Sequence, residues 1–140
     1  MTYISESLRR KVVARANACC EYCLLPDNLS FYPHEVDHIT ALKHGGKTET
    51  ENLAYACWRC NRYKGTDLGS FDPATGKFSF LFNPRTQYWH EHFKWQDAQI
   101  LGQTLEGRTT AYLLQLNTQA RIEERQRINI SYWGSDRTTR

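Results

Sequence analysis

The sequence contains no run of 18 apolar residues, so we do not expect it to cross a membrane as a helix. Its first residues lack the apolar stretch of a secretory signal, and glycine (8) and proline (4) are too scarce for a low-complexity or collagen-like chain. Charge of one sign is also scarce, because 18 basic and 15 acidic residues leave a net charge of only +3. That excess permits a nucleic-acid partner without requiring one.

Cysteine is what the chain does have, with five residues and no sign of export. We expect such a chain to be cytoplasmic, where closely spaced cysteines indicate metal binding before disulfides. Two C-x-x-C pairs, Cys20 with Cys23 and Cys57 with Cys60, are separated by 33 residues. Each pair places two thiolates in one tight turn, so together they predict a closed, structural zinc site. Cys19 is left over, either as a small packed side chain or as a ligand in place of Cys20.

Periodicity predicts short helices and short β segments along the chain. The predicted helices, the first of them capped by Ser5, cover residues 5–17, 108–116 and 118–128. A short basic segment after Cys57 is expected to end at Gly65. The β-compatible segments are 35–39, a hairpin within 66–84 with alternating Phe78, Phe80 and Phe82, and a strand pair or helix-to-strand passage over 88–101.

No internal repeat or linker divides the 140 residues, so we expect a single domain. Within it, residues 1–65 hold nearly all of the candidate chemistry. Residues 66–130 would form an extension, and residues 131–140 a flexible tail.

Between the cysteine pairs lie residues with the chemistry of phosphodiester hydrolysis. Asp37 and His38 are adjacent, Asn52 follows 14 residues after His38, and Asn61 comes directly after the last ligand cysteine. Carboxylate and amide oxygens are hard ligands that suit Mg²⁺, which also binds substrate phosphate. A neutral histidine beside that cation can take a proton from water. An Asp-His pair is by itself more typical of an ordinary surface or core pair, but its place between two zinc knuckles favours metal-assisted hydrolysis.

The order and spacing of these residues resemble the HNH endonuclease signature over residues 9–65. The matching motifs are C-x-x-C, Val36-Asp37-His38-Ile39, Gly45-Gly46, Asn52-Leu53 and Cys57-x-x-Cys60-Asn61-x-x-Lys64-Gly65. The resemblance implies an α+β fold, in which a ββα-metal, treble-clef-like finger is held by the four-cysteine zinc site. A small α+β extension would follow the finger.

The resemblance also implies a role for each site residue and DNA as the substrate. His38 would be the general base, Asp37 and Asn61 would hold a catalytic Mg²⁺ or Mn²⁺, and Asn52 would orient the loop that carries His38. Asn61 stands where the family usually has its final histidine, so this is an H-N-N variant. Cleavage would leave a 5′-phosphate and a 3′-hydroxyl.

Three basic residues near the second cysteine pair are candidate DNA contacts, namely Lys64, Arg62 and Arg59. For Lys64, a helix C-terminal lysine favoured by the helix dipole is an equally good interpretation. Glu35 shares a strand face with Asp37, and we interpret it as a turn-side carboxylate rather than an acceptor for the site.

In the C-terminal half, Arg85 and Arg108 are further candidates for DNA contact. Three functions remain open at this point. The chain is a metal-dependent DNA endonuclease, a non-cleaving zinc-stabilised nucleic-acid-binding module, or a zinc-stapled interaction domain. The intact set of site residues favours the first.

Overall fold

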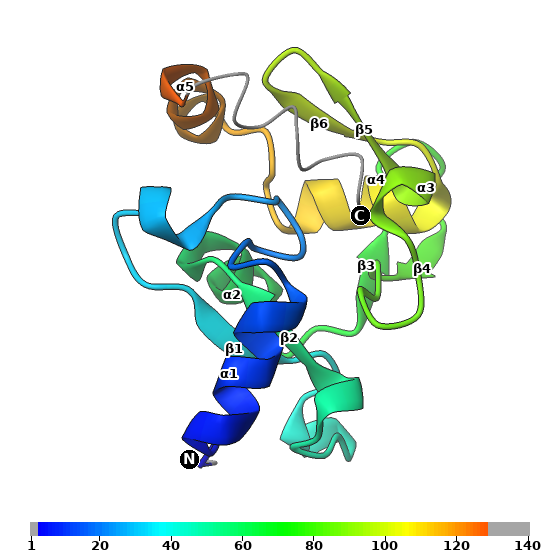
Figure 1. Ribbon diagram of the computed structural model, residues 1–140. Coiled ribbons are helices and arrows are strands. Elements are labelled where there is room, and N and C mark those ends of the chain that lie inside the picture. Colours follow the sequence, from blue (N-terminus) through cyan, green and yellow to red (C-terminus); the bar gives the residue numbers. More distant parts are fainter. Residues whose placement is uncertain (1–2, 129–140) are drawn as a thin grey trace. The chain divides into compact units, whose positions relative to one another are not determined.

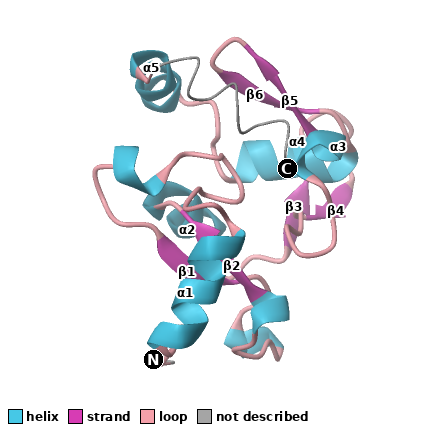
Figure 2. Ribbon diagram, in the orientation of Figure 1, coloured by secondary structure: helices cyan, strands magenta, loops and turns pink. Residues whose placement is uncertain are grey.

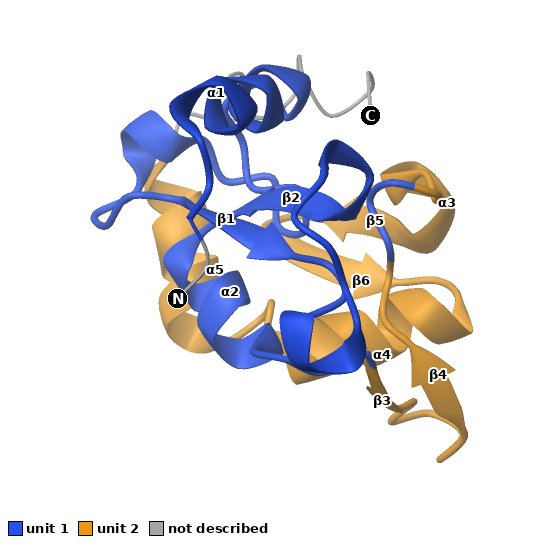
Figure 3. Cartoon of the chain, turned by 90° about the horizontal axis from the view of Figure 1, so that it is seen from below, with its two compact units in different colours: residues 1–68, 83–85 blue, residues 69–82, 86–140 orange. Residues whose placement is uncertain are grey.

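The computed structural model describes residues 3–128, so the predicted flexible tail over 131–140 lies outside the described residues. The chain divides into two compact units (Figure 3). The first, called the N-terminal unit, comprises Met1–Leu68 and Asn83–Arg85. The second, called the C-terminal unit, comprises Gly69–Phe82 and Thr86–Arg140. The sequence predicts an extension that begins after residue 65. It does not predict that the segment Asn83–Arg85 belongs to the first unit. No helix of the described residues is long and apolar enough to cross a membrane.

The N-terminal unit begins with helix α1, Glu6–Arg15 (Figure 1). Ser5 caps it as predicted, since its side chain accepts a hydrogen bond from the backbone N–H of Leu8 at 3.1 Å. The helix buries Val12 in a small apolar cluster together with Ala16, Leu53 and Tyr55. Through this cluster the helix packs against the strand that carries Leu53 and Tyr55.

A two-stranded antiparallel sheet and a short helix follow, and they confirm the predicted ββα finger (Figure 2). Strand β1 is Glu35–His38, strand β2 is Leu53–Ala56, and helix α2 is Trp58–Lys64. Asp37 pairs with Ala54 and His38 with Leu53 across the sheet. Three short 3₁₀ turns complete the unit, at Asp27–Leu29, Leu42–His44 and Thr50–Asn52. Gly65 ends α2, as the sequence predicts.

Within the described residues, the C-terminal unit contains two further hairpins and three helices, drawn in Figure 2. Its elements are β3 (Gly69–Phe71), β4 (Phe78–Phe80), α3 (Trp89–His92), β5 (Phe93–Gln96), β6 (Gln99–Gly102), α4 (Leu105–Leu113) and α5 (Gln119–Arg127). These elements confirm the hairpin within 66–84, the helix-to-strand passage and the two last helices. Phe82 does not continue the alternation, because it lies beyond β4 and is buried, whereas Phe78 and Phe80 are exposed.

Aromatic packing and two glycines hold this unit together. The ring of Phe93 lies 5.3 Å from that of Phe82 and 5.1 Å from that of Trp89. A Cβ atom on Gly102 would lie 2.3 Å from the backbone nitrogen of Arg108, and one on Gly107 would lie 2.0 Å from a backbone oxygen. Helix α4 therefore approaches β6 at Gly102 and the end of α3 at His92 as closely as it does only because Gly102 and Gly107 lack a side chain.

Candidate active site and metal centre

The four predicted ligand cysteines meet in the N-terminal unit. The sulfur atoms of Cys20, Cys23, Cys57 and Cys60 all lie within 4.8 Å of one another, and all four side chains are buried. Cys23 Sγ lies 3.6 Å from Cys57 Sγ. Two sulfurs bound tetrahedrally to one zinc at the usual Zn–S length of ~2.3 Å would be separated by ~3.8 Å. The cluster therefore has the dimensions of a zinc site.

The backbone around the cluster also fits bound thiolates. The N–H groups of Tyr22 and Cys23 point to Cys20 Sγ, and the N–H of Cys60 points to Cys57 Sγ, each at 3.4 Å. Burial, followed by contacts with the neighbouring thiols, raises the pKa of Cys20 well above its ordinary value. A buried thiolate set of this kind is stable only around a cation, and sulfur donors select zinc over magnesium.

The structure also decides between Cys19 and Cys20. Cys20 belongs to the four-sulfur cluster, whereas the Cys19 thiol donates to the backbone oxygen of Asn17 at 3.3 Å. Cys19 is therefore the packed side chain and not a ligand.

Asp37 is buried on β1 and is held by two partners from different parts of the unit. Lys64 Nζ lies 3.1 Å from Asp37 Oδ2, and the Tyr22 hydroxyl donates to the same oxygen at 3.4 Å. Lys64 Nζ also donates to the backbone oxygens of His38 and Ile39 at 3.2 and 3.1 Å. Burial raises the pKa of Asp37, while the Lys64 ammonium opposes that rise. The lysine thus fixes both the carboxylate and the end of the strand that carries it.

A second strand-to-helix contact runs beside the first. Asn61 Nδ2 donates to Glu35 Oε2 at 2.6 Å. Glu35 and Asp37 are two residues apart on β1 and so share a face, while Asn61 and Lys64 are three residues apart on α2 and share a face. Two strand residues span ~6.6 Å and three helical residues span ~4.5 Å, which lets the two pairs form side by side.

His38 lies at the end of β1, where the chain turns into a loop held by Asn52. His38 Nε2 lies 2.9 Å from Thr48 Oγ1. Asn52 Oδ1 accepts from the N–H of Thr40 at 2.8 Å, and its Nδ2 donates to the backbone oxygens of Thr40 and Lys47 at 2.9 and 2.8 Å. A Cβ atom on Gly46 would lie 1.8 Å from that Thr40 oxygen, so the loop closes only with glycine there.

The residues around this loop line a cavity of about 350 Å³. Asp37, His38 and Asn61 all line it, together with Lys43 and Thr66. The arrangement gathers a carboxylate, an imidazole and an amide from β1 and α2 at one place. Asn52 does not line the cavity, but it hydrogen-bonds to the loop that follows His38.

The three basic residues predicted to contact DNA differ in their exposure and in their contacts. The prediction for Lys64 is wrong in this structure, because its side chain is 2% exposed and its ammonium is engaged by Asp37. Arg62 is exposed on α2. The Arg59 guanidinium lies over the Trp58 ring, 5.0 Å from its centroid.

The structure also places three other residues whose roles were predicted, namely Glu35, Arg85 and Arg108. Glu35 is an acceptor for Asn61, so it is part of the site rather than a turn-side carboxylate. Arg85 is half-buried and forms an ion pair with Glu21, and Arg108 forms two hydrogen bonds with the buried Asp72 at 3.0 and 2.8 Å. Both arginines are held by carboxylates inside their own unit.

Tyr22 and Thr48 contact the site, and sequence reasoning missed both. Tyr22 could have been found, since it lies between the first two ligand cysteines and that knuckle must approach the finger. Thr48 had no comparable signal, because its contact depends on how the loop after His38 folds.

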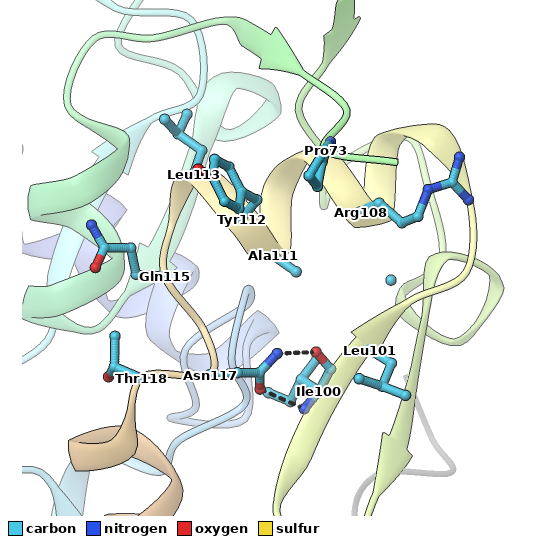
Figure 4. A pocket seen from close by; sticks show the side chains of 11 residues that line it. Pro73, Ile100, Leu101, Arg108, Ala111, Tyr112, Leu113, Gln115, Asn117 and Thr118 are labelled. Atoms are coloured by element: carbon cyan, nitrogen blue, oxygen red, sulfur yellow. Dashed lines mark hydrogen bonds between the residues drawn. The ribbon is translucent and has the colours of Figure 1, made fainter. Parts of the chain in front are cut away.

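The C-terminal unit holds a second cavity of about 840 Å³ between α4 and β6 (Figure 4). Among the described residues that line it, the charged side chain is Arg108, which is engaged by Asp72. Asn117 completes the wall by exchanging two 2.8 Å hydrogen bonds with the backbone of Ile100. The lining is otherwise largely apolar and offers no cluster of titratable groups within residues 3–128.

The N-terminal site lies in a part of the chain that matches a known family model. Residues 20–67 match the family model described as HNH endonuclease. No curated protein and no solved structure matches the chain. The matched range contains all four ligand cysteines and the residues that line the 350 Å³ cavity.

Proposed function

We propose that the chain is a metal-dependent DNA endonuclease, because residues 20–67 match the family model described as HNH endonuclease. The observation that carries this proposal is the meeting of Asp37, His38 and Asn61 in one cavity of the zinc-stapled finger. Together with a divalent cation, these three groups would be enough for hydrolysis of a phosphodiester bond by an activated water.

His38 is the general base in this proposal. A neutral imidazole that donates its Nε2 proton to Thr48 Oγ1 keeps its lone pair on Nδ1. That nitrogen accepts the proton of a water, and the resulting hydroxide forms a new bond to phosphorus as the bond to the 3′-oxygen breaks. The products are a 5′-phosphate and, after proton return to the leaving oxygen, a 3′-hydroxyl.

Asp37 and Asn61 are the proposed ligands of the catalytic Mg²⁺ or Mn²⁺. Lys64 and Tyr22 both bind Asp37 Oδ2, so Oδ1 is the oxygen that would face the ion. An amide and a carboxylate oxygen fit a hard cation that keeps several waters and also binds substrate phosphate. When bound, the ion neutralises charge on the scissile phosphate and on the leaving oxygen.

Asn52 and Lys64 act on the reaction through other groups, as positioning residues. Asn52 closes the loop after His38 with its three hydrogen bonds, and Lys64 fixes the backbone oxygens of His38 and Ile39. Rigid support of this kind keeps a general base in the geometry that its reaction needs.

The proposal is tested by nicking of supercoiled plasmid with the zinc-loaded full chain, with and without Mg²⁺. We expect nicking that depends on Mg²⁺ and falls by about 10²–10⁴-fold in His38→Ala, the usual contribution of a general base. Plasmid that stays supercoiled but is retarded in a gel-shift assay would instead indicate a non-cleaving nucleic-acid-binding module. Absence of both cutting and binding would indicate a zinc-stapled interaction domain.

A further inference from the structure

The N-terminal unit carries an aromatic cluster, exposed at two of its members and half-buried at Trp58 and Arg59, that the proposed chemistry does not use. It consists of Phe31, Tyr32, Trp58 and Arg59. Phe31 is 86% exposed and Tyr32 is 50% exposed. Their ring centroids are 4.8 Å apart, those of Tyr32 and Trp58 are 4.9 Å apart, and both pairs are edge-to-face. The Arg59 guanidinium lies over the Trp58 ring at 5.0 Å.

Two segments of the chain connect the aromatic cluster to the proposed cleavage site, namely α2 and the residues that lead into β1. Trp58 and Asn61 are three residues apart on α2, so they share one face of that helix and are separated by about one turn. Tyr32 precedes Glu35 by three residues, and the Glu35 carboxylate contacts Asn61 at 2.6 Å. The cluster is therefore adjacent to a proposed ligand of the catalytic ion, within reach of a nucleotide beside the scissile phosphate.

The chemistry of the aromatic cluster matches nucleic-acid bases. Exposed aromatic faces and an arginine guanidinium are the groups on which bases stack, largely without regard to base identity. Helix α2 has no acidic residue, and it presents Arg59 and the exposed Arg62 beside the rings. A base that stacks on protein must have a free face, which the bases inside a continuous duplex do not have.

We propose that the aromatic cluster is a stacking site for an unpaired base, so that the enzyme acts on DNA that is single-stranded at the cleavage point. This inference rests on the proposed function and adds the class of substrate. Phe31 supplies the most accessible ring of the cluster, and Tyr32 packs edge-to-face against both Phe31 and Trp58.

The test measures binding with the full chain in a His38→Ala background, so that the DNA is not cut during the measurement. Fluorescence anisotropy compares a labelled single-stranded oligonucleotide with the duplex of the same sequence. We expect Phe31→Ala and Tyr32→Ala each to weaken single-strand binding about 5- to 100-fold, the usual effect of losing one base–aromatic stack. Duplex binding should stay within about twofold, because it does not use the stack.

Two further variants make the test specific. Phe80→Ala removes a ring that is 66% exposed in the C-terminal unit, and it should leave single-strand binding unchanged. Trp58→Phe keeps an aromatic face, so single-strand binding should be retained. Because the variant lacks the tryptophan next to the bound base, the oligonucleotide should quench a smaller fraction of the tryptophan fluorescence.

Unchanged single-strand binding in Phe31→Ala and Tyr32→Ala would overturn the stacking proposal, as would an equal loss on duplex or an equal loss in Phe80→Ala. Failure of the proposed function gives a different result, because it appears as a wild-type chain that cuts neither supercoiled plasmid nor the labelled single-stranded oligonucleotide, whatever the oligonucleotide binding shows.

Discussion

The two units of the chain are stabilised by different kinds of interaction. The N-terminal unit has a small apolar cluster, and it also holds four buried thiols, the buried ion pair Lys64–Asp37 and the largely buried ion pair Arg85–Glu21. The C-terminal unit instead packs aromatic and aliphatic side chains such as Phe93, Trp89 and Ile100. Its buried arginines bond to backbone oxygens, as Arg121 does to Leu114 at 3.0 Å.

This difference between the units shows that residues of the N-terminal unit serve both its stability and its proposed chemistry. Buried charges cost free energy unless they are paired, so the N-terminal unit depends on each of its partners being present. Asp37 is both a structural member of an ion pair and the proposed ligand of the catalytic ion. No such double use is found among the described core residues of the C-terminal unit, whose stability should not depend on metal.

The largest expected effect is loss of zinc, which should unfold one unit and leave the other folded. A structural zinc contributes roughly 10–16 kcal/mol of apparent binding free energy, more than a domain's usual stability of about 5–15 kcal/mol. In Cys57→Ser, amide resonances of residues 6–64 in two-dimensional NMR should collapse to unfolded positions. Those of residues 89–127 should stay dispersed.

Cys19→Ser is the matched control, because Cys19 is a buried cysteine outside the cluster. It should keep about one zinc per chain and both sets of resonances. Loss of zinc from Cys19→Ser, or a folded N-terminal unit in Cys57→Ser, would contradict the assignment of the ligands.

Removal of Lys64 should have the next largest effect, again confined to the N-terminal unit. Lys64→Met leaves the Asp37 carboxylate buried without its cation, which typically costs about 3–5 kcal/mol. The free energy of unfolding is measured in urea, with release of zinc to a chromogenic chelator as the signal for this unit.

Two companion variants sharpen this result. Lys64→Met combined with Asp37→Asn should recover part of the loss, because the uncompensated charge is gone. Lys43→Met replaces an exposed lysine that lines the same cavity and should change stability by less than about 0.5 kcal/mol. Equal losses in Lys64→Met and Lys43→Met would show that burial of the ion pair is not what matters.

A smaller effect is expected in the C-terminal unit, where pH tests the Arg108–Asp72 pair. Hydrogen bonds from Arg108 hold the pKa of Asp72 well below its ordinary value. A carboxyl with a lowered pKa stabilises the fold above its unfolded pKa of about 3.9, and that contribution is lost as pH falls through the folded value. Asp72→Asn should therefore be less stable than wild type at pH 7, and the gap should narrow below about pH 4.

Asp97→Asn, at an exposed turn position between β5 and β6, should show no such gap. Thermal unfolding of the C-terminal unit at a series of pH values measures both variants. A gap for Asp72→Asn that stays constant down to acid pH would mean that ionisation of Asp72 is not the source of the stabilisation.

The sequence predicted features that depend on local spacing. The two C-x-x-C pairs indicated the zinc ligands, Ser5 indicated the start of α1, and Gly65 indicated the end of α2. The motif around Asp37-His38 indicated the finger, and residues 20–67 match its family. Each of these signals is carried by residues that are neighbours in sequence or repeat at a fixed interval.

The features it did not predict depend on partners far apart in the chain. Lys64 lies on the correct face of α2, but spacing does not tell whether that face meets solvent or the buried Asp37. Similarly, nothing near Arg85 indicates that it returns to the N-terminal unit to pair with Glu21. Charged residues look alike in sequence whether they are exposed or paired inside, so their partners emerge only from the tertiary structure.

The central claim is that His38 activates water in an Mg²⁺-dependent nuclease, and one measurement tests it most directly. Initial nicking rates on supercoiled plasmid are compared for wild type, His38→Ala and His44→Ala, each checked to retain its zinc. His44 is exposed and contacts the backbone oxygen of Thr66, so its variant controls for loss of a histidine. The account predicts wild-type nicking by His44→Ala and a loss of about 10²–10⁴-fold in His38→Ala. Equal rates for His38→Ala and wild type would contradict it.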